Sequence, residues 1–117
     1  MSESLLATEA LGGRGATHPR VTLADIEAAI AREEYFVLSD AIERKSVGGL
    51  LPEDVFTICV LFMKNGFMQL GYSAPASLEN FDAEKGRVFA RENAIRGLWP
   101  IMGFALRDRL HATPPIG

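Results

Sequence analysis

The stretch Phe56–Ser73, FTICVLFMKNGFMQLGYS, joins two apolar runs through the dipeptide Asn65-Gly66. A two-residue Asn-Gly connection between apolar runs is typical of a β-hairpin, because both central positions of a type I′ turn need φ > 0. We therefore predict antiparallel strands over residues 55–64 and 67–73. Asn65 and Gly66 are the turn residues, with Lys64 in solvent beside them.

The chain before the hairpin is predicted to begin with a helix. Thr22-Leu23-Ala24-Asp25 resembles a capping box, and apolar residues recur at 3–4 residue spacing over Thr22–Glu33. Tyr35–Leu38 is either a third strand or a continuation of the helix into Asp40–Arg44. We favour the strand, because two strands alone are marginally stable in water.

A long helix is predicted after the hairpin, from about Leu78 to Leu98. Trp99-Pro100 kinks or ends it, because a proline biases the residue before it away from the α region. A short helix, Ile101–Leu110, follows. Gly86 is assigned a structural role. The helix has an apolar line that we expect to pack on the hairpin, namely Phe81, Val88, Ile95 and Trp99. A second line consists of small side chains that let another backbone come close, namely Ala83, Ala90, Ala94 and Gly97.

Together these elements predict a single α+β domain over residues 21–110. Residues 1–20 are predicted to be a flexible leader with at most one loose helical turn at Leu5–Leu11, and residues 111–117 a flexible tail. The chain has 117 residues, of which 48% are hydrophobic and 23% charged, as in ordinary globular proteins.

The charge distribution argues against general nucleic-acid binding. The formal net charge is −3, divided into −5 for residues 1–60 and +2 for residues 61–117. Any affinity for anions is therefore expected in the second half. No apolar run reaches the ~18 residues of a membrane span, and no signal peptide is recognised, so we expect no membrane association and an intracellular protein.

Catalytic chemistry has little support in the sequence. Cys59 is the single cysteine, and it lies in an apolar strand pattern where a small buried residue is typical. His18 and His111 both lie in the predicted tails, away from it. We find no paired carboxylates, metal-ligand spacing, Ser/His/Asp set or nucleotide-binding glycine motif. We therefore expect neither an enzyme nor a metal or cofactor site.

One polar stripe of the long helix is a candidate binding site. It is formed by Asn80, Glu84, Arg87 and Arg91. It lies between the apolar line and the small-residue line. Glu84 and Arg87 can form an i,i+3 ion pair while the arginine stem covers apolar surface. Alternatively, Asn80, Arg87 and Arg91 present donors to a phosphate or to a partner's carboxylate. Trp99 is either a core residue whose indole N–H needs one partner, or a stacking surface for a ligand.

Several motifs together resemble one known family. They are Thr57-Ile58-Cys59, Lys64-Asn65-Gly66-Phe67, Ser77, Glu79-Asn80-Phe81-Asp82-Ala83-Glu84, Gly86-Arg87, Ala90-Arg91-Glu92-Asn93-Ala94, Trp99-Pro100, Gly103 and Leu106. This pattern resembles the small tailed-phage protein family often called the gene-49/gene-66 family, over most of residues 57–110. A weaker similarity covers the helix from Thr22 and Glu34-Tyr35-Phe36. The chain departs from the family at Met68, where threonine or valine is common, and at Tyr72-Ser73, where a glutamate-serine pair is common.

The resemblance implies a small non-virion phage protein that acts in the host cytoplasm by binding. It supplies no catalytic or binding residues. The first hypothesis is an accessory protein for host takeover or anti-defence that binds a host protein complex. Homo-oligomerisation is expected, because one helix leaves an edge and a face of a small sheet uncovered.

Two other hypotheses remain open. In the first alternative the protein is a small-ligand module that sequesters a signalling nucleotide. Arg87 and Arg91 would hold phosphates, and Trp99, Phe67 or Tyr72 would stack a base. The second is nucleic-acid binding through the basic second half, against which the net charge argues.

Overall fold

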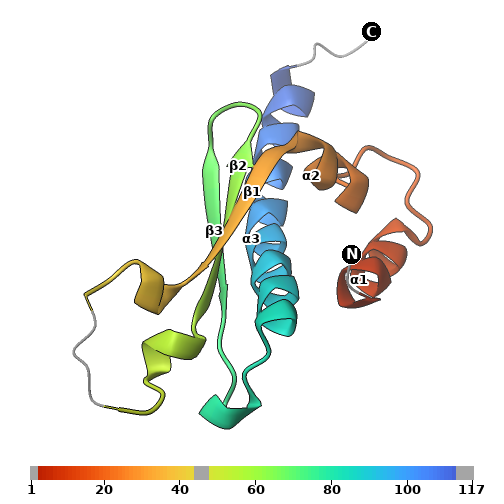
Figure 1. Cartoon of the computed structure of the whole chain (residues 1–117). Helices are drawn as coiled ribbons and strands as arrows, with labels where there is room; N and C mark the ends of the chain where they lie inside the picture. Colours follow the sequence, from red (N-terminus) through yellow and green to blue (C-terminus); the bar gives the residue numbers. More distant parts are fainter. Residues whose placement is uncertain (1–2, 44–47, 113–117) are drawn as a thin grey trace, which may run out of the picture.

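The computed structural model describes residues 3–43 and 48–112, and it has the predicted α+β class. One long helix lies along one face of a three-stranded sheet, and two shorter helices lie beside it (Figure 1). In chain order the elements are α1 (Glu3–Gly13), α2 (Leu23–Ala29), β1 (Ile30–Val37), β2 (Thr57–Met63), β3 (Met68–Ser73) and α3 (Ala83–Ala112). The predicted tail beyond residue 112 and part of the loop before β2 lie outside the described residues.

The sheet is antiparallel in the order β1-β2-β3, so the hairpin and the third strand are both confirmed. Strand β1 is longer than predicted, because Ile30 already pairs with Met63 of β2. Helix α2 consequently ends at Ala29, and the prediction of a helix to Glu33 was wrong. Sheet pairing thus overrides the helical spacing of residues 30–33. The capping box is confirmed, since Thr22 Oγ1 accepts from the Asp25 N–H at 3.0 Å.

The hairpin turn differs in type from the prediction. Gly66 has φ +91°, but Asn65 does not have a positive φ, so the turn is not type I′. The Gly66 N–H donates to the Met63 carbonyl at 2.9 Å, and the Met63 N–H donates to the Phe67 carbonyl at 2.8 Å. This pattern is a three-residue loop with glycine in the left-handed region. The Asn65 side chain accepts from the Phe67 N–H at 2.9 Å, which adds a local reason for asparagine at this position.

Helix α3 packs on the sheet mainly through its small side chains. Ala90 and Ala94 are fully buried; of the predicted apolar line, Ile95 is fully buried in the core cluster, whereas Val88 is 44% exposed. The reason is close approach: a Cβ added to Gly71 of β3 would lie 2.1 Å from the Ala90 carbonyl oxygen. Large side chains cannot enter so narrow a gap.

The Trp99-Pro100 sequence does not end α3. The helix includes Pro100 and continues to Ala112, so the predicted separate helix at Ile101–Leu110 is the last part of α3. These last turns extend past the tip of the hairpin and lie beside α2 (Figure 1).

The first twenty residues contain more structure than the predicted loose turn. Helix α1 spans 11 residues, and Leu5 is only 1% exposed because it packs in the same core cluster as Leu23, Ile26 and Ile95. Arg96 of α3 also donates to the Ser4 hydroxyl at 2.5 Å. The helix is therefore held by tertiary contacts, which local sequence does not display.

Candidate functional site

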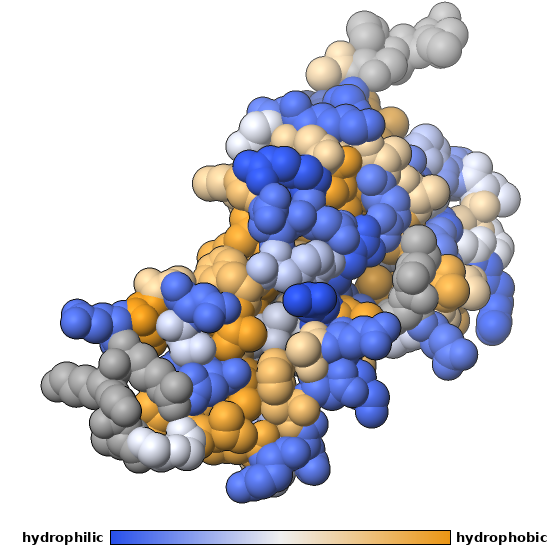
Figure 2. All heavy atoms as spheres, in the orientation of Figure 1, coloured by the Kyte–Doolittle hydropathy of each residue, from blue (hydrophilic) through white to orange (hydrophobic). Residues whose placement is uncertain are grey.

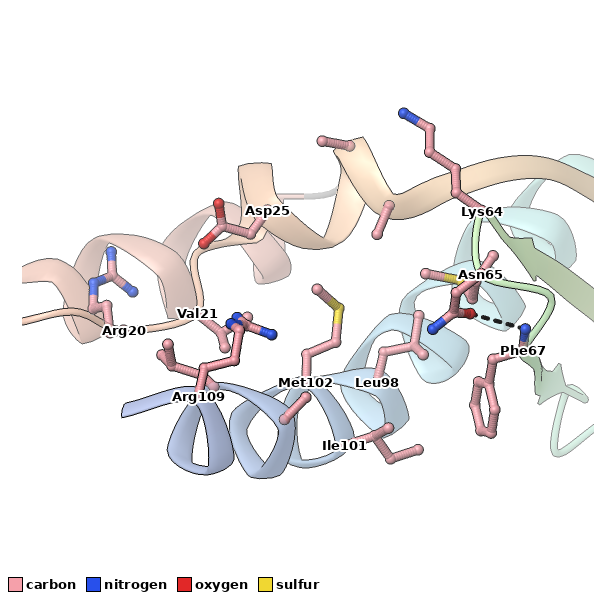
Figure 3. Close-up of a pocket in the computed structure, with 15 residues that line it drawn as sticks. Arg20, Val21, Asp25, Lys64, Asn65, Phe67, Leu98, Ile101, Met102 and Arg109 are labelled. Carbon is pink, nitrogen blue, oxygen red and sulfur yellow. Dashed lines mark hydrogen bonds between the residues drawn. The ribbon is translucent and has the colours of Figure 1, made fainter. Parts of the chain in front are cut away.

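A groove of about 580 Å³ lies between α2, the hairpin tip and the second half of α3. Figure 3 shows Arg20 and Arg109 toward one end and Lys64 and Phe67 toward the other. Its apolar lining comes from all three elements and includes Val21, Ala28, Ala29, Met63, Leu98, Ile101, Met102, Ala105 and Leu106. The volume lies in the range of known ligand and side-chain pockets.

The extension of α3 past the sheet creates this groove. Beyond Leu98 the helix has no strand beneath it, so Met102 points from α3 into the space beside α2 (Figure 3). Met63 and Met102 both line the groove, and unbranched thioether side chains adapt to differently shaped apolar groups. The groove therefore offers an adaptable apolar surface.

Most charged side chains that line the groove are basic. Arg20, Lys64 and Arg109 line it together with the carboxylate of Asp25, and the charge of Arg20 is balanced by Glu9 of α1. The pKa of Asp25 is lowered, first because its carboxylate accepts from the Thr22 backbone N–H, and in smaller part by the field of Arg109. Asp25 is thus committed to capping α2, and the groove favours an apolar group flanked by negative charge.

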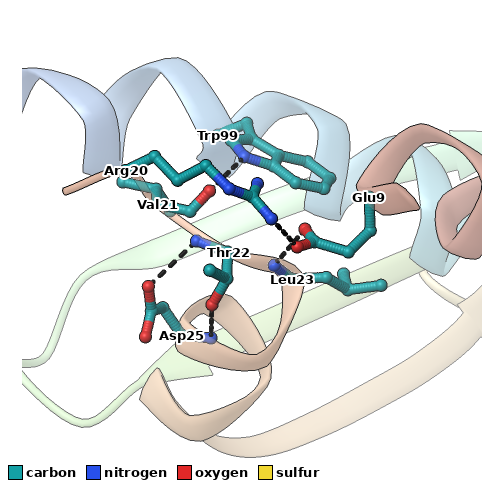
Figure 4. A network of polar contacts seen from close by, with 7 residues as sticks. All are labelled: Glu9, Arg20, Val21, Thr22, Leu23, Asp25 and Trp99. Carbon is teal, nitrogen blue, oxygen red and sulfur yellow. Dashed lines mark hydrogen bonds and ion pairs between the residues drawn. The ribbon is translucent and has the colours of Figure 1, made fainter. Parts of the chain in front are cut away.

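A polar network fixes the end of the groove at which α2 begins (Figure 4). Glu9 of α1 forms an ion pair with Arg20 and accepts from the Leu23 N–H at 2.7 Å. The pKa of Glu9 is lowered, chiefly by the hydrogen bond from Arg20. The Trp99 indole N–H donates to the Val21 carbonyl at 3.0 Å, which supplies the partner that the sequence required.

The four predicted binding residues do not meet in one hollow among the described residues. Arg91 binds two carboxylates: it donates to Glu27 at 2.7 and 2.5 Å and to Glu33 at 3.0 Å. These bonds join α3 to α2 and β1. The pKa of Glu27 is lowered, first by the Arg91 hydrogen bond.

Arg87 and Asn80 line separate small hollows, and Trp99 lies beside Val21. The hollow at Arg87 is about 140 Å³ and is also lined by Thr57, whose buried hydroxyl has no hydrogen-bond partner among the described residues. Gly86 is structural as predicted, since an added Cβ would lie 2.6 Å from Thr57 Oγ1. Binding roles for Asn80, Arg87, Arg91 and Trp99 stay predictions.

The sequence did not identify the groove, because its residues come from three separate stretches. Arg20 had been placed in the leader, Lys64 beside a turn, and Met102 and Arg109 in a separate last helix. A continuous α3 would have been the signal, since the apolar positions of residues 98, 102, 105 and 106 then share one face with no strand beneath.

Covalent chemistry at Cys59 is opposed by its surroundings. The thiol is fully buried, and burial raises its pKa to about 11, so the reactive thiolate is not populated at neutral pH. Within residues 3–43 and 48–112, no three His, Cys, Asp or Glu side chains are grouped as metal ligands. In the same ranges, no helix has both the length and the apolar character to cross a membrane.

The fold and the groove define a small α+β protein in which a single long helix covers one sheet face and extends past it. The model of the phage protein (N4 Gp49/phage Sf6 gene 66) family matches residues 21–110. The chain belongs to this family, as its motifs had indicated. No curated protein and no solved structure matches the chain.

Proposed function

We propose that this phage protein is a non-enzymatic accessory protein that acts in the host cytoplasm by binding a host protein complex, in host takeover or anti-defence. The groove of about 580 Å³ carries the proposal. Its apolar lining suits a partner segment with an aliphatic or aromatic anchor, and the exposed Lys64 at its hairpin end suits a neighbouring carboxylate, in the manner of a helix in a groove. Membership of a phage protein family supports a role during infection.

The test fills the groove without disturbing the core. Ala105 lines the groove and is exposed, so Ala105→Trp occupies the space that the partner needs. Ala24 of α2 is also exposed and does not line the groove, which makes Ala24→Trp the matched control. Affinity capture from host lysate identifies proteins held by the wild type and by Ala24→Trp but lost with Ala105→Trp.

The identified protein is then purified and titrated by calorimetry. We expect Ala105→Trp to weaken binding by at least ~10-fold, about 1.4 kcal/mol, because the anchor loses its pocket. Lys64→Glu reverses an exposed charge at the groove. It should weaken binding of the partner more at low salt than at high salt, because salt screens the interaction between charges. Equal binding by wild type and Ala105→Trp would contradict the groove as the binding site.

A further inference from the structure

The sheet face opposite α3 is not covered by any described part of the chain. Antiparallel pairing aligns the side chains of this face in three rows across β1, β2 and β3: Arg32–Phe62–Met68, Glu34–Val60–Leu70 and Phe36–Ile58–Tyr72. We call these nine residues the open face. The alternate residues of β2, among them Cys59 and Leu61, are fully buried under α3, which confirms that the rows point away from the helix.

The open face is apolar at seven of its nine positions, and its β3 residues are well exposed. Met68 is 60%, Leu70 63% and Tyr72 60% exposed. Apolar surface also runs along the sheet side of the molecule in the space-filling view (Figure 2). A solvated sheet face ordinarily carries alternating polar side chains, so this composition is that of a face made to be covered.

The size of the open face indicates how much surface a partner covers. Strand spacing and rise give the open face a projected area on the order of 350 Å². Two such faces bury on the order of 700 Å², and the side chains at their rims must add roughly 300 Å² to reach the ~1,000 Å² of a specific interface.

The outer edge of β3 is a poorer docking place than the open face. The Tyr72 N–H donates to the Asn93 side chain of α3 at 3.0 Å, and the Gln69 amide donates to the Leu70 carbonyl at 3.4 Å. Backbone groups that an added strand would need are therefore already occupied. Pairing through this edge of the sheet is therefore disfavoured.

We propose that the open face is the interface of a homodimer, in which a second copy of this chain packs its own open face against it. The charges of the face suit self-association, because Arg32 and Glu34 form an ion pair at 3.0 Å and together carry no net charge. The Arg32 guanidinium also lies 3.7 Å from the centre of the Phe62 ring of β2, so one row of the face is held by a cation–π contact. An isologous contact therefore has an apolar centre at Val60 and Leu70 and a polar rim on β1.

This inference goes beyond the proposed function, because the groove lies between α2, α3 and the hairpin tip and shares no residue with the open face. A dimer formed through the sheets leaves both grooves uncovered. One dimer thus presents two equal binding sites, and a partner complex with repeated subunits is held with avidity.

Sedimentation velocity of the purified full chain at about 10 µM tests the dimer, a concentration at which a Kd of ~1 µM gives mostly dimer. The wild type is expected to sediment at twice the chain mass of 12.8 kDa. Leu70→Glu places a charge at the centre of the proposed interface but at an exposed position of the single chain. We expect it to sediment mostly as a monomer, with a Kd raised at least ~100-fold, and with an unchanged far-ultraviolet circular dichroism spectrum.

The matched control is Phe104→Glu, because Phe104 is a 70% exposed apolar residue on α3, outside the open face. This variant is expected to remain a dimer. If Leu70→Glu does not fold, Met68→Glu, which lies in another row of the face, is measured in its place. A monomeric wild type, a dimer unaffected by either face substitution, or a dimer dissociated only by Phe104→Glu would overturn the proposal. Ala105→Trp, which fills the groove, should leave the dimer intact, so the two proposals fail separately.

Discussion

At Gly71, strand β3 lies in close contact with the backbone of helix α3. A Cβ at this position would lie 2.1 Å from the Ala90 carbonyl oxygen and 2.4 Å from the Ala94 nitrogen. Both neighbours are backbone atoms of a helix, so they cannot move aside as a flexible side chain can. The glycine, together with the alanines facing it, sets the distance between the helix and the sheet.

We predict that Gly71→Ala lowers the free energy of unfolding by about 3 kcal/mol, because the helix must shift to admit a methyl group. Gly103→Ala is the control, since an added Cβ at Gly103 of α3 meets no atom within 4 Å. Alanine favours a helix by ~0.5–1 kcal/mol over glycine, so this variant should be slightly stabilised. Urea denaturation of both proteins measures the difference, and equal effects would refute the close packing at Gly71.

Arg91 joins three elements, because its guanidinium on α3 binds Glu27 of α2 and Glu33 of β1. Its side chain is 21% exposed and that of Glu27 24%, so solvent screens this pair only in part. In the fold its donors bind Glu27 and Glu33, and a further role in binding an anion stays a prediction. Its position on the stripe was predictable, but its partners were not, since they lie 64 and 58 residues away in the chain.

Replacing Arg91 by methionine should lower the free energy of unfolding by about 2 kcal/mol at pH 7, because two carboxylates lose their donor. The folded-state pKa of Glu27 is depressed, so the stabilisation is present above the unfolded-state value near 4.5 and is lost as the pH falls below it. Denaturation at pH 7 and near pH 3 is therefore expected to show a difference between wild type and variant that shrinks in acid.

Arg87→Met is the control for Arg91→Met on helix α3, because Arg87 is exposed and makes no ion pair with a described residue. Its effect should stay within about 0.5 kcal/mol at both pH values. If Arg91→Met were as mild, or if its effect persisted undiminished near pH 3, the ion pairs would not be the source of its stability.

At the scale of the whole molecule, the sequence predicts those features of the fold that depend on the pattern of neighbouring residues. The hairpin, the capping box at Thr22 and the α+β class follow from residues close together in the chain. The length of β1, the continuity of α3 through Pro100 and the docking of α1 depend on contacts between distant residues, and local spacing predicted them incorrectly or incompletely. The groove belongs to this second group, because it exists only once α3 extends beyond the sheet.

The sequence predicts a flexible leader over residues 1–20, whereas the structure packs helix α1 against the core. The two descriptions lead to different expectations for substitutions in α1. Leu5 is 1% exposed in the core cluster, and its neighbour Leu6 is 50% exposed. If α1 is held as described, Leu5→Ala leaves a cavity and lowers the free energy of unfolding by about 3 kcal/mol, whereas Leu6→Ala changes it by less than ~1 kcal/mol. Urea denaturation followed by Trp99 fluorescence measures both, because Glu9 of α1 and Trp99 meet in the network around Val21 and Leu23 (Figure 4). Small and equal effects would show that the first helix does not contribute to the core, and a large difference would show that the folding unit begins well before residue 21.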